Sequence, residues 1–405
     1  MTYAVRNVRA VLPDTVLDDA TIVVEDGIIT SVKQGGAAPS DAYDGLGAFC
    51  FPGLIDTHSD GLEKELRPRP QVDLPADFAV RSFEGRVRAA GVTTLYHGVG
   101  FENGAKYQRS IALANSLCDA IERRAAGSAA LIDHRILYRL DARDREGFEA
   151  LQRRLPIRVD DGAKPLVSFE DHTPGQGQYS NRRQFEIYIA GSRGVSDDVA
   201  RKIVDELIIE RDQLLVNREQ ALPWLTHAAG TGTIRLMAHD PVSADDVDDA
   251  ASWNAAIAEF PTTIDAARRA QKHGLRTVSG GPNVLRGQSH SGNISAAELI
   301  SLGLCNGLAS DYMPSTLVGA VGVLVNRGVC GLPQAVALVT SGPAETVGLT
   351  DRGRLEPGLR GDLAVVASEG SWLTVRAVFR PEDNSIDGSV VDRRVRWSRR
   401  GRDAR

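Results

Sequence analysis

Two side chains able to bind metal stand two positions apart at the end of an apolar run. They are His58 and Asp60, in the stretch Phe-Pro-Gly-Leu-Ile-Asp-Thr-His-Ser-Asp. Residues two apart on an extended strand point the same way, so both side chains would project from one strand end. This geometry suits chelation of one or two metal ions. The alternative is a strand that leads into an ordinary polar loop.

Two more candidates directly follow short apolar runs. His239 follows Ile-Arg-Leu-Met-Ala, and Asp311 follows Gly-Leu-Ala-Ser. Taken alone, each could be a helix cap or could form hydrogen bonds within a loop. Together with His58 and Asp60 they form a plausible metal-binding set, and nitrogen and carboxylate ligands suit Zn²⁺, Mn²⁺ or Fe²⁺ better than Ca²⁺.

The run Val-Ser-Phe-Glu-Asp-His supplies further polar groups. Alternation along a strand puts Glu170 and His172 on one side, and we favour His172 as the metal ligand with Glu170 as its alternative. Asp171 could orient a neighbouring imidazole. Asp141, at the end of another run, could bridge two metals or pair with an adjacent arginine. His97 has no second ligand nearby, so we favour a structural or substrate-contact role.

Basic residues accompany these candidates. A glycine-rich polar loop over 280–293 contains Arg286, His290 and Asn293. Lys64 lies close behind the first ligand pair, and Arg183 belongs to a third basic cluster. Cations that converge on a metal centre predict an anionic, phosphorylated small-molecule substrate.

The pattern between residues 53 and 345 must position these side chains. Short β-type runs alternate with helical segments, which is typical of parallel α/β architecture. Eight such units in this length fit a TIM-like (β/α)₈ barrel, whose active sites gather at the carboxyl ends of the strands. The predicted strands end near His58, His97, Asp141, His172, His239, Phe260, Gly280 and Asp311. The loop over 280–293 thus follows the seventh strand, where barrels commonly bind phosphate.

Both ends of the chain look different from this middle part. Residues 1–52 and 346–405 contain short β runs and turns, and Asp26-Gly27 between two such runs is a hairpin signal. We therefore predict a small β-sandwich domain assembled from both chain ends, beside a metal-dependent hydrolase barrel over 53–345.

Composition limits the class of protein. The chain has 405 residues, 42% of them hydrophobic, which suffices for one large domain and a smaller companion. The net charge of −6 argues against general nucleic-acid binding. Neither a membrane span nor a signal peptide is evident, so we expect a cytoplasmic protein. The four cysteines are scattered, which argues against a disulfide framework. Because symmetric oligomers are common, we expect a homodimer.

Several motifs of the sequence resemble those of a known family. The stretch that ends at His58, together with Gly-Arg-Leu-Glu-Pro-Gly-Leu-Arg-Gly-Asp-Leu-Ala-Val-Val over 353–366, resembles the amidohydrolase superfamily over almost the whole chain. A series of further motifs resembles the PhnM family of the carbon–phosphorus lyase pathway. These are His58-Ser-Asp60, Leu-Glu63-Lys64, Arg-Pro-Arg-Pro70, Asp171-His172-Thr-Pro-Gly-Gln176, Ala-His239-Asp240, Glu259-Phe-Pro-Thr-Thr263, Gly-Pro-Asn283, Arg286-Gly-Gln-Ser-His290-Ser-Gly-Asn293 and Ser-Asp311-Tyr312.

The resemblance implies a divalent-metal hydrolase that releases diphosphate from α-D-ribose 1-methylphosphonate 5-triphosphate in phosphonate metabolism. By analogy, metal would be held by His58, Asp60, His172 and His239, with Asp141 as a possible bridge. Asp311 would bind metal or accept a proton from the attacking water, and it would form the catalytic set with His239. The phosphate contacts would come from Lys64, Arg286 and His290, with Asn293 and Arg183 as further candidates.

Four positions near the site depart from the pattern of that family. They are Gly61, Glu65, Asp141 and Pro241, where we expect Asn, His, Glu and Asp. The alternative is an amidohydrolase of a C–N bond, such as a deacetylase or cyclic-amide hydrolase, for which a phosphorylated amide is one candidate substrate. A catalytically silent binding protein on this fold is a third hypothesis, and the retention of Asp311 and the histidines argues against it.

Overall fold

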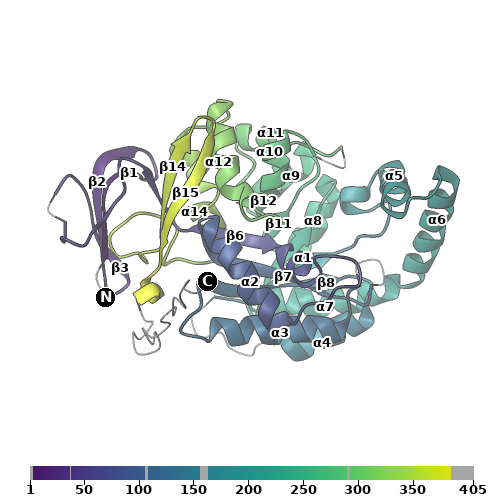
Figure 1. The fold of residues 1–405 in the computed structure, drawn as a ribbon. Helices are drawn as coiled ribbons and strands as arrows, with labels where there is room; N and C mark the ends of the chain where they lie inside the picture. The colour runs from purple at the N-terminus through teal and green to yellow at the C-terminus, as the bar shows by residue number, and fades with distance from the viewer. Residues whose placement is uncertain (1–2, 37, 105–107, 156–162, 290–291, 385–405) are drawn as a thin grey trace, which may run out of the picture.

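The computed structural model describes residues 3–36, 38–104, 108–155, 163–289 and 292–384 (Figure 1). Eight parallel strands follow one another around a barrel in chain order, so the predicted (β/α)₈ architecture is confirmed. The barrel strands are β6 (Leu54–Ser59), β7 (Val92–Phe101), β8 (Asp133–Asp141), β9 (Leu166–Glu170), β10 (Arg235–His239), β11 (Ile257–Glu259), β12 (Arg276–Gly280) and β13 (Gly307–Ala309).

Most predicted strand ends lie within two residues of the observed ones. The end predicted near His97 is wrong, because β7 continues to Phe101 and pairs with β8 along that extension. His172 follows β9 by two residues, since that strand ends at Glu170.

The first and last barrel strands meet at their carboxyl ends. The amide of Asp311 donates to the carbonyl of His58 at 3.0 Å, and the amide of Asp60 donates to the carbonyl of Asp311 at 2.5 Å. Further down, backbone groups of Leu338 and Val339 bond to both strands. The barrel therefore closes at the level where the predicted ligands lie.

A layer of apolar side chains fills the barrel below these ends. Every barrel strand contributes one buried residue to it, and each large aliphatic side chain or methionine among them stabilises the fold by roughly 1.5–3 kcal/mol when fully buried. The eight residues are Ile55, Tyr96, Leu137, Leu166, Met237, Ile257, Val278 and Ala309. Polar side chains are therefore brought together at the carboxyl ends.

Helices cover the outside of the barrel, and short strand-to-helix loops bring polar residues to its rim. Helices α8 and α9 are capped at their N-termini by Ser243 and Thr263, whose hydroxyls accept hydrogen bonds from the amides of Asp246 and Ala266. The helices are α1 (Gly61–Leu66), α2 (Ala76–Ala89), α3 (Ile111–Ala125), α4 (Arg145–Arg154), α5 (Arg182–Arg193), α6 (Asp197–Gln213), α7 (Leu215–Gly230), α8 (Ala244–Ser252), α9 (Ile264–Lys272), α10 (Gly281–Arg286), α11 (Ala296–Ser301), α12 (Thr316–Asn326), α13 (Leu332–Ala337) and α14 (Ser341–Val347).

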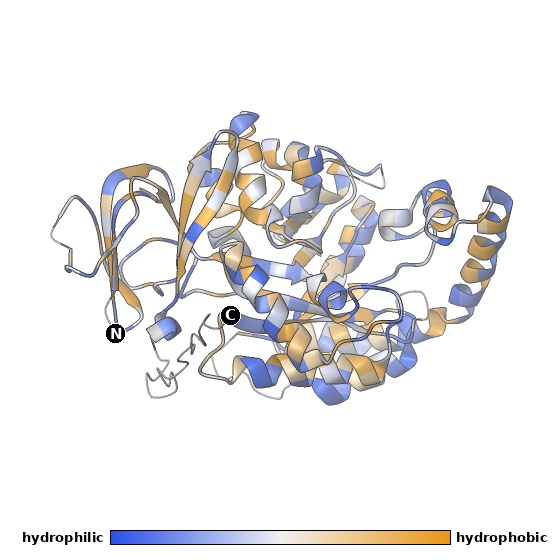
Figure 2. Ribbon diagram, viewed as in Figure 1, coloured by the Kyte–Doolittle hydropathy of each residue, from blue (hydrophilic) through white to orange (hydrophobic). Residues whose placement is uncertain are grey.

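Helices α5 and α6 form an arm that projects from the barrel (Figure 1). The arm has its own small core, which includes Phe185 and Ile189 of α5 and Val204 of α6. Apolar and polar residues alternate along α6, as the orange and blue segments in Figure 2 show. One face of α6 thus packs on α5 while the other carries charge.

A second, mixed sheet of seven strands contains residues from both ends of the described chain. At Asp26 and Gly27 the φ angles are +50° and +82°, which matches the predicted hairpin turn. Strand β14 runs antiparallel to β5 and thereby joins the two ends. The strands are β1 (Tyr3–Val11), β2 (Val16–Glu25), β3 (Ile28–Gln34), β4 (Tyr43–Asp44), β5 (Phe49–Pro52), β14 (Leu363–Glu369) and β15 (Trp372–Phe379).

Two further expectations can be compared with the described residues. Within those ranges, none of the helices is both long and apolar enough to cross a membrane. All four cysteines are free thiols, as their spacing predicts.

Candidate active site

A cavity of about 160 Å³ lies at the carboxyl ends of the barrel strands. Five of the six predicted metal ligands line it: His58, Asp60, His172, His239 and Asp311. Two predicted substrate contacts also line it, Arg286 from α10 and Asn293 from the loop that follows. The cavity thus combines metal-binding side chains with a cation and hydrogen-bond donors.

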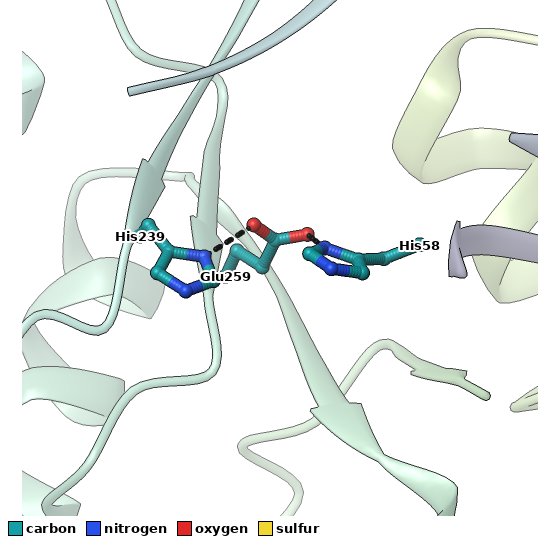
Figure 3. A group of neighbouring side chains, drawn as sticks. All are labelled: His58, His239 and Glu259. Atoms are coloured by element: carbon teal, nitrogen blue, oxygen red, sulfur yellow. Dashed lines mark hydrogen bonds and ion pairs between the residues drawn. The ribbon is translucent and has the colours of Figure 1, made fainter. Parts of the chain in front are cut away.

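A buried carboxylate orients two of the imidazoles (Figure 3). One oxygen of Glu259 lies 2.7 Å from Nδ1 of His58, and the other lies 2.7 Å from Nδ1 of His239. Glu259 is fully buried and also accepts a hydrogen bond from the Ser168 hydroxyl at 2.9 Å. With Nδ1 engaged, Nε2 is the ring atom left for a metal, which is the usual arrangement of histidine ligands.

Three sets of side chains bring their ligand atoms within 4.8 Å of one another. The first contains His58, Asp60 and Asp311, the second contains Glu170, His172 and His239, and the third is the trio of Figure 3. Imidazole nitrogens and carboxylate oxygens in this number fit a first-row divalent ion such as Zn²⁺, Mn²⁺ or Fe²⁺. The donor chemistry of the site therefore matches the metal implied by the family resemblance.

The charges around the imidazoles favour a cation. Burial alone would lower the pKa of His58 and His239, but the surrounding carboxylates raise the pKa of His58 well above its usual value and that of His239 to about 9. Burial opposes ionisation of Glu259, yet the same two histidines lower its pKa to about 2. A field that stabilises protonated imidazole also attracts a metal ion, which would displace the proton.

His172 lies in a different environment. Burial lowers its pKa to about 3, although the Glu170 carboxylate nearby acts in the opposite direction. The distance from its Nδ1 to Oε2 of Glu170 is 3.8 Å. A neutral imidazole is the form that can donate an electron pair to a metal.

Three residues at the rim have left-handed backbone conformations. The φ angles of Asp240, Phe260 and Asp311 are +52°, +52° and +57°, which are uncommon outside glycine. The Phe260 ring packs edge-on against both His58 and His239, with centroid distances of 5.2 and 5.6 Å. Strained backbone of this kind concentrates at functional sites.

Arginine 139 is a cavity-lining residue that we did not predict. Its guanidinium contacts both oxygens of Asp60 at 2.6 Å and both oxygens of Glu170 at 2.8 and 2.9 Å. The sequence pattern could have indicated this residue: Arg139 precedes Asp141 by two positions, so β8 presents both side chains on one side. Glu259 was also missed as an orienting residue, although it ends β11 directly before Phe260.

Two predicted site residues lie elsewhere. Asp141 is not among the cavity-lining residues, because both its oxygens contact the guanidinium of Arg211 on α6, at 2.8 and 2.9 Å. The partner is thus an arginine, as one hypothesis had it, but not one adjacent in sequence. Arg183 lies on α5, where it pairs with Glu186 and Asp197 within the arm.

The remaining candidates are distributed around the cavity. Lys64 does not line it directly, but its Nζ lies 4.2 Å from the ring centroid of Tyr312, which does. His290 lies outside the described residues. His97 is buried and contacts His134 at 2.9 Å, away from the cavity lining.

The structure accounts for two of the departures from the family pattern. A Cβ at Gly61 would lie 2.4 Å from Cζ of Phe83 on α2, so this position has no room for a side chain. Glu65 bonds to Ser82 and Arg86 of the same helix. Both positions therefore face α2. Nothing in the structure explains Pro241.

The chain is similar in sequence to known enzymes. No family model matches the chain. Over 383 residues it is 32% identical to the α-D-ribose 1-methylphosphonate 5-triphosphate diphosphatase of Escherichia coli K12, covering 93% of this chain and 98% of that protein. It is 25% identical over 379 residues to the imidazolonepropionase of Deinococcus deserti, with 87% of each chain covered.

Solved structures agree on the fold. The structure of 5-methylcytosine deaminase from Klebsiella pneumoniae superposes with a TM-score of 0.61, at 15% identity, over 94% of this chain and 96% of that chain. Two findings assign the chain to a family. The first is its identity to the E. coli protein over almost the full length of both chains. The second is a barrel that carries histidine and aspartate at its strand ends. The chain belongs to the PhnM family of the amidohydrolase superfamily, and it is a hydrolase.

Proposed function

We propose that this hydrolase uses a divalent metal to release diphosphate from α-D-ribose 1-methylphosphonate 5-triphosphate. The observation that carries the proposal is a single cavity in which the His58, Asp60 and Asp311 cluster shares its lining with Arg286 and Asn293. The first group suits a metal, and the second suits a phosphate chain. The relative from E. coli is named for this reaction.

The metal would be held by histidine nitrogens and carboxylate oxygens from His58, Asp60, His172, His239 and Asp311. When bound there, a divalent ion would lower the pKa of its bound water towards about 7 and would polarise a phosphoryl oxygen. Glu259 keeps the rings of His58 and His239 oriented through their Nδ1 atoms.

Residues of the chain perform the remaining tasks. Asp311 accepts a proton from the attacking water, which adds to phosphorus as a phosphoanhydride bond breaks. Diphosphate leaves, and the 5-phosphate stays on the ribose. Arg286 offers a guanidinium to the phosphate oxygens, where charge-assisted bonds bind and orient the chain. Lys64, held beside Tyr312, adds a second cation at the rim.

The test is to follow the phosphorus species by ³¹P NMR with metal-loaded protein and this triphosphate. Wild type is expected to release diphosphate, whereas Asp311→Asn, which keeps the size but cannot accept the proton, is not. An intact triphosphate in the presence of bound metal would contradict the proposal.

A second candidate is hydrolysis of a C–N bond, which the match to an imidazolonepropionase favours. The same cluster could activate water toward an amide carbon. If the triphosphate stays intact, phosphorylated amides are the substrates to test next, with ammonia or amine release as the measurement.

A further inference from the structure

A permanent positive charge lies among the candidate metal ligands. Arg139 is only 5% exposed and lines the cavity together with His58, His172 and His239. The arginine side chain stays protonated in proteins. The site therefore contains a cation of its own.

The Arg139 guanidinium pairs with a carboxylate on each of two sides. It touches both oxygens of Asp60, at 2.6 Å, and both oxygens of Glu170, at 2.8 and 2.9 Å. Glu170 is 3% exposed, and an arginine in such a paired fork has a strongly preferred geometry. Arg139 thus links β6 to β9 across the barrel interior.

The neighbouring strand leaves room for this arrangement. A Cβ at Gly98 of β7 would lie 2.5 Å from Oδ1 of Asp60 and 3.0 Å from Cδ of Arg139. Glycine at this position lets the carboxylate and the guanidinium lie side by side against β7. Three strands therefore contribute to the placement of the charge.

Two further buried carboxylates near the site, Asp141 and Glu259, are also engaged. Hydrolases with two ions keep them about 3.5–4 Å apart, a spacing that shared carboxylate ligands maintain. Both oxygens of Asp141 contact Arg211, and the two oxygens of Glu259 each hold a histidine. Four carboxylates around the site are therefore already in contact with arginine or histidine.

From this geometry we infer that the centre holds one divalent ion, and that Arg139 takes the place a second ion would have between Asp60 and Glu170. Arg139 is a positioning residue: it fixes Asp60 for the single ion and balances the charge of Glu170. The inference rests on the proposal that the site binds metal. It does not depend on which substrate is hydrolysed.

Metal counting tests the inference without an activity assay. The full chain is stripped, reloaded with excess Mn²⁺, desalted and measured by elemental mass spectrometry and electron paramagnetic resonance. One manganese per chain with the hyperfine pattern of an isolated ion is expected. Two per chain with an exchange-coupled spectrum would overturn the inference but leave the proposed hydrolase intact. Failure to bind manganese, and likewise zinc and iron(II) in parallel reloading experiments, would overturn both.

Variants test the part played by the guanidinium. Arg139→Met frees Asp60 and Glu170, and the stoichiometry is expected to rise from one manganese toward two. The matched control is Arg109→Met, which removes a neighbouring arginine that pairs with Glu63 and Glu102. It is expected to stay at one. Arg139→Met that also stays at one would overturn the role of Arg139, and the wild-type measurement decides the nuclearity even if that variant does not fold.

Discussion

Nδ1 of His58 lies 2.7 Å from the carboxylate of Glu259, a residue 201 positions later in the chain that is fully buried. The pair joins the first barrel strand to the sixth across the barrel interior. Because the other Glu259 oxygen holds His239, one carboxylate sets the ring orientation of two candidate ligands. Metal binding should therefore depend strongly on a residue that need not touch the metal.

Glu259→Gln is expected to weaken metal binding by roughly 10–100-fold, the usual effect of removing a carboxylate that orients histidine ligands. A glutamine amide has only one oxygen, so it cannot offer a separate acceptor oxygen to each of the two imidazole rings. Titration calorimetry of the metal-free protein with Zn²⁺ measures the effect. Ser168→Ala removes only the hydroxyl that bonds to Glu259 and should weaken metal binding much less. Wild-type affinity in Glu259→Gln would show that the rings hold their orientation unaided.

Chain order alone was enough to predict much of the site. Parallel strands bring their carboxyl ends to one edge, so a His or Asp after each apolar run was expected near the others. This reasoning predicted that His58, His239 and Asp311 lie together, and all three line one cavity. It could not find the partners, because a strand pattern does not show which side chains meet across the barrel. Arg139 is the clearest case.

The positions of Asp141 and Arg183 outside the cavity lining have the same origin. Asp141 follows an apolar run as the other candidates do, yet α6 supplies Arg211 from 70 positions later and binds both oxygens. The arm of α5 and α6 also pairs Arg183 with its own carboxylates. The direction in which the arm projects depends on tertiary packing, which a pattern of apolar and polar residues along the chain does not show.

Arg286→Met should raise KM for a phosphorylated substrate more than it lowers kcat. A hydrogen bond to a charged group contributes about 1.5–3 kcal/mol, so a rise of roughly 10–100-fold is expected. Steady-state kinetics at fixed ionic strength measure it. Arg268→Met, on the exposed surface of α9, is the matched control and should leave KM unchanged. An equal effect in both variants would point to a general loss of charge.

Glu84 should make the stability of the fold depend on acidity. It lies on α2 and bonds to His134 of β8 at 3.0 Å and to Arg124 of α3 at 2.7 Å. Burial would raise its pKa, but these hydrogen bonds lower it from 4.5 to about 2. Since the folded-state pKa is the lower one, ionised Glu84 stabilises the native state above about pH 4.5, and this contribution is lost as the pH falls toward 2.

Glu84→Gln should remove this acid-dependent part. Urea unfolding of the metal-free protein, repeated from about pH 6 to about pH 3, should give a flatter decline in the variant than in wild type. Near neutral pH the variant should be less stable by roughly 3 kcal/mol, because Arg124 loses its buried partner. The same pH dependence in both proteins would mean that the pKa of Glu84 does not differ between the folded and unfolded states.

Gly61 is the departure from the family pattern that the structure explains best, and it can be tested by stability alone. Alanine favours helices over glycine, so Gly61→Ala at the start of α1 should be neutral or stabilising if only local propensity mattered. A Cβ there would lie 2.4 Å from the Phe83 ring, and such overpacking costs about 1–3 kcal/mol. We therefore expect destabilisation in guanidinium unfolding.

The double variant Gly61→Ala with Phe83→Leu separates the clash from any other effect. Leucine lacks the far edge of the ring. The loss of unfolding free energy in the double variant should therefore be smaller than the sum of the two single losses, by about 1 kcal/mol or more. Additive costs would show that the ring does not exclude a side chain at this position. Coupling would show that Phe83 and Gly61 depend on each other. It would also explain how α1, which begins directly after Asp60, packs closely on α2 without the Asn that the family pattern has here.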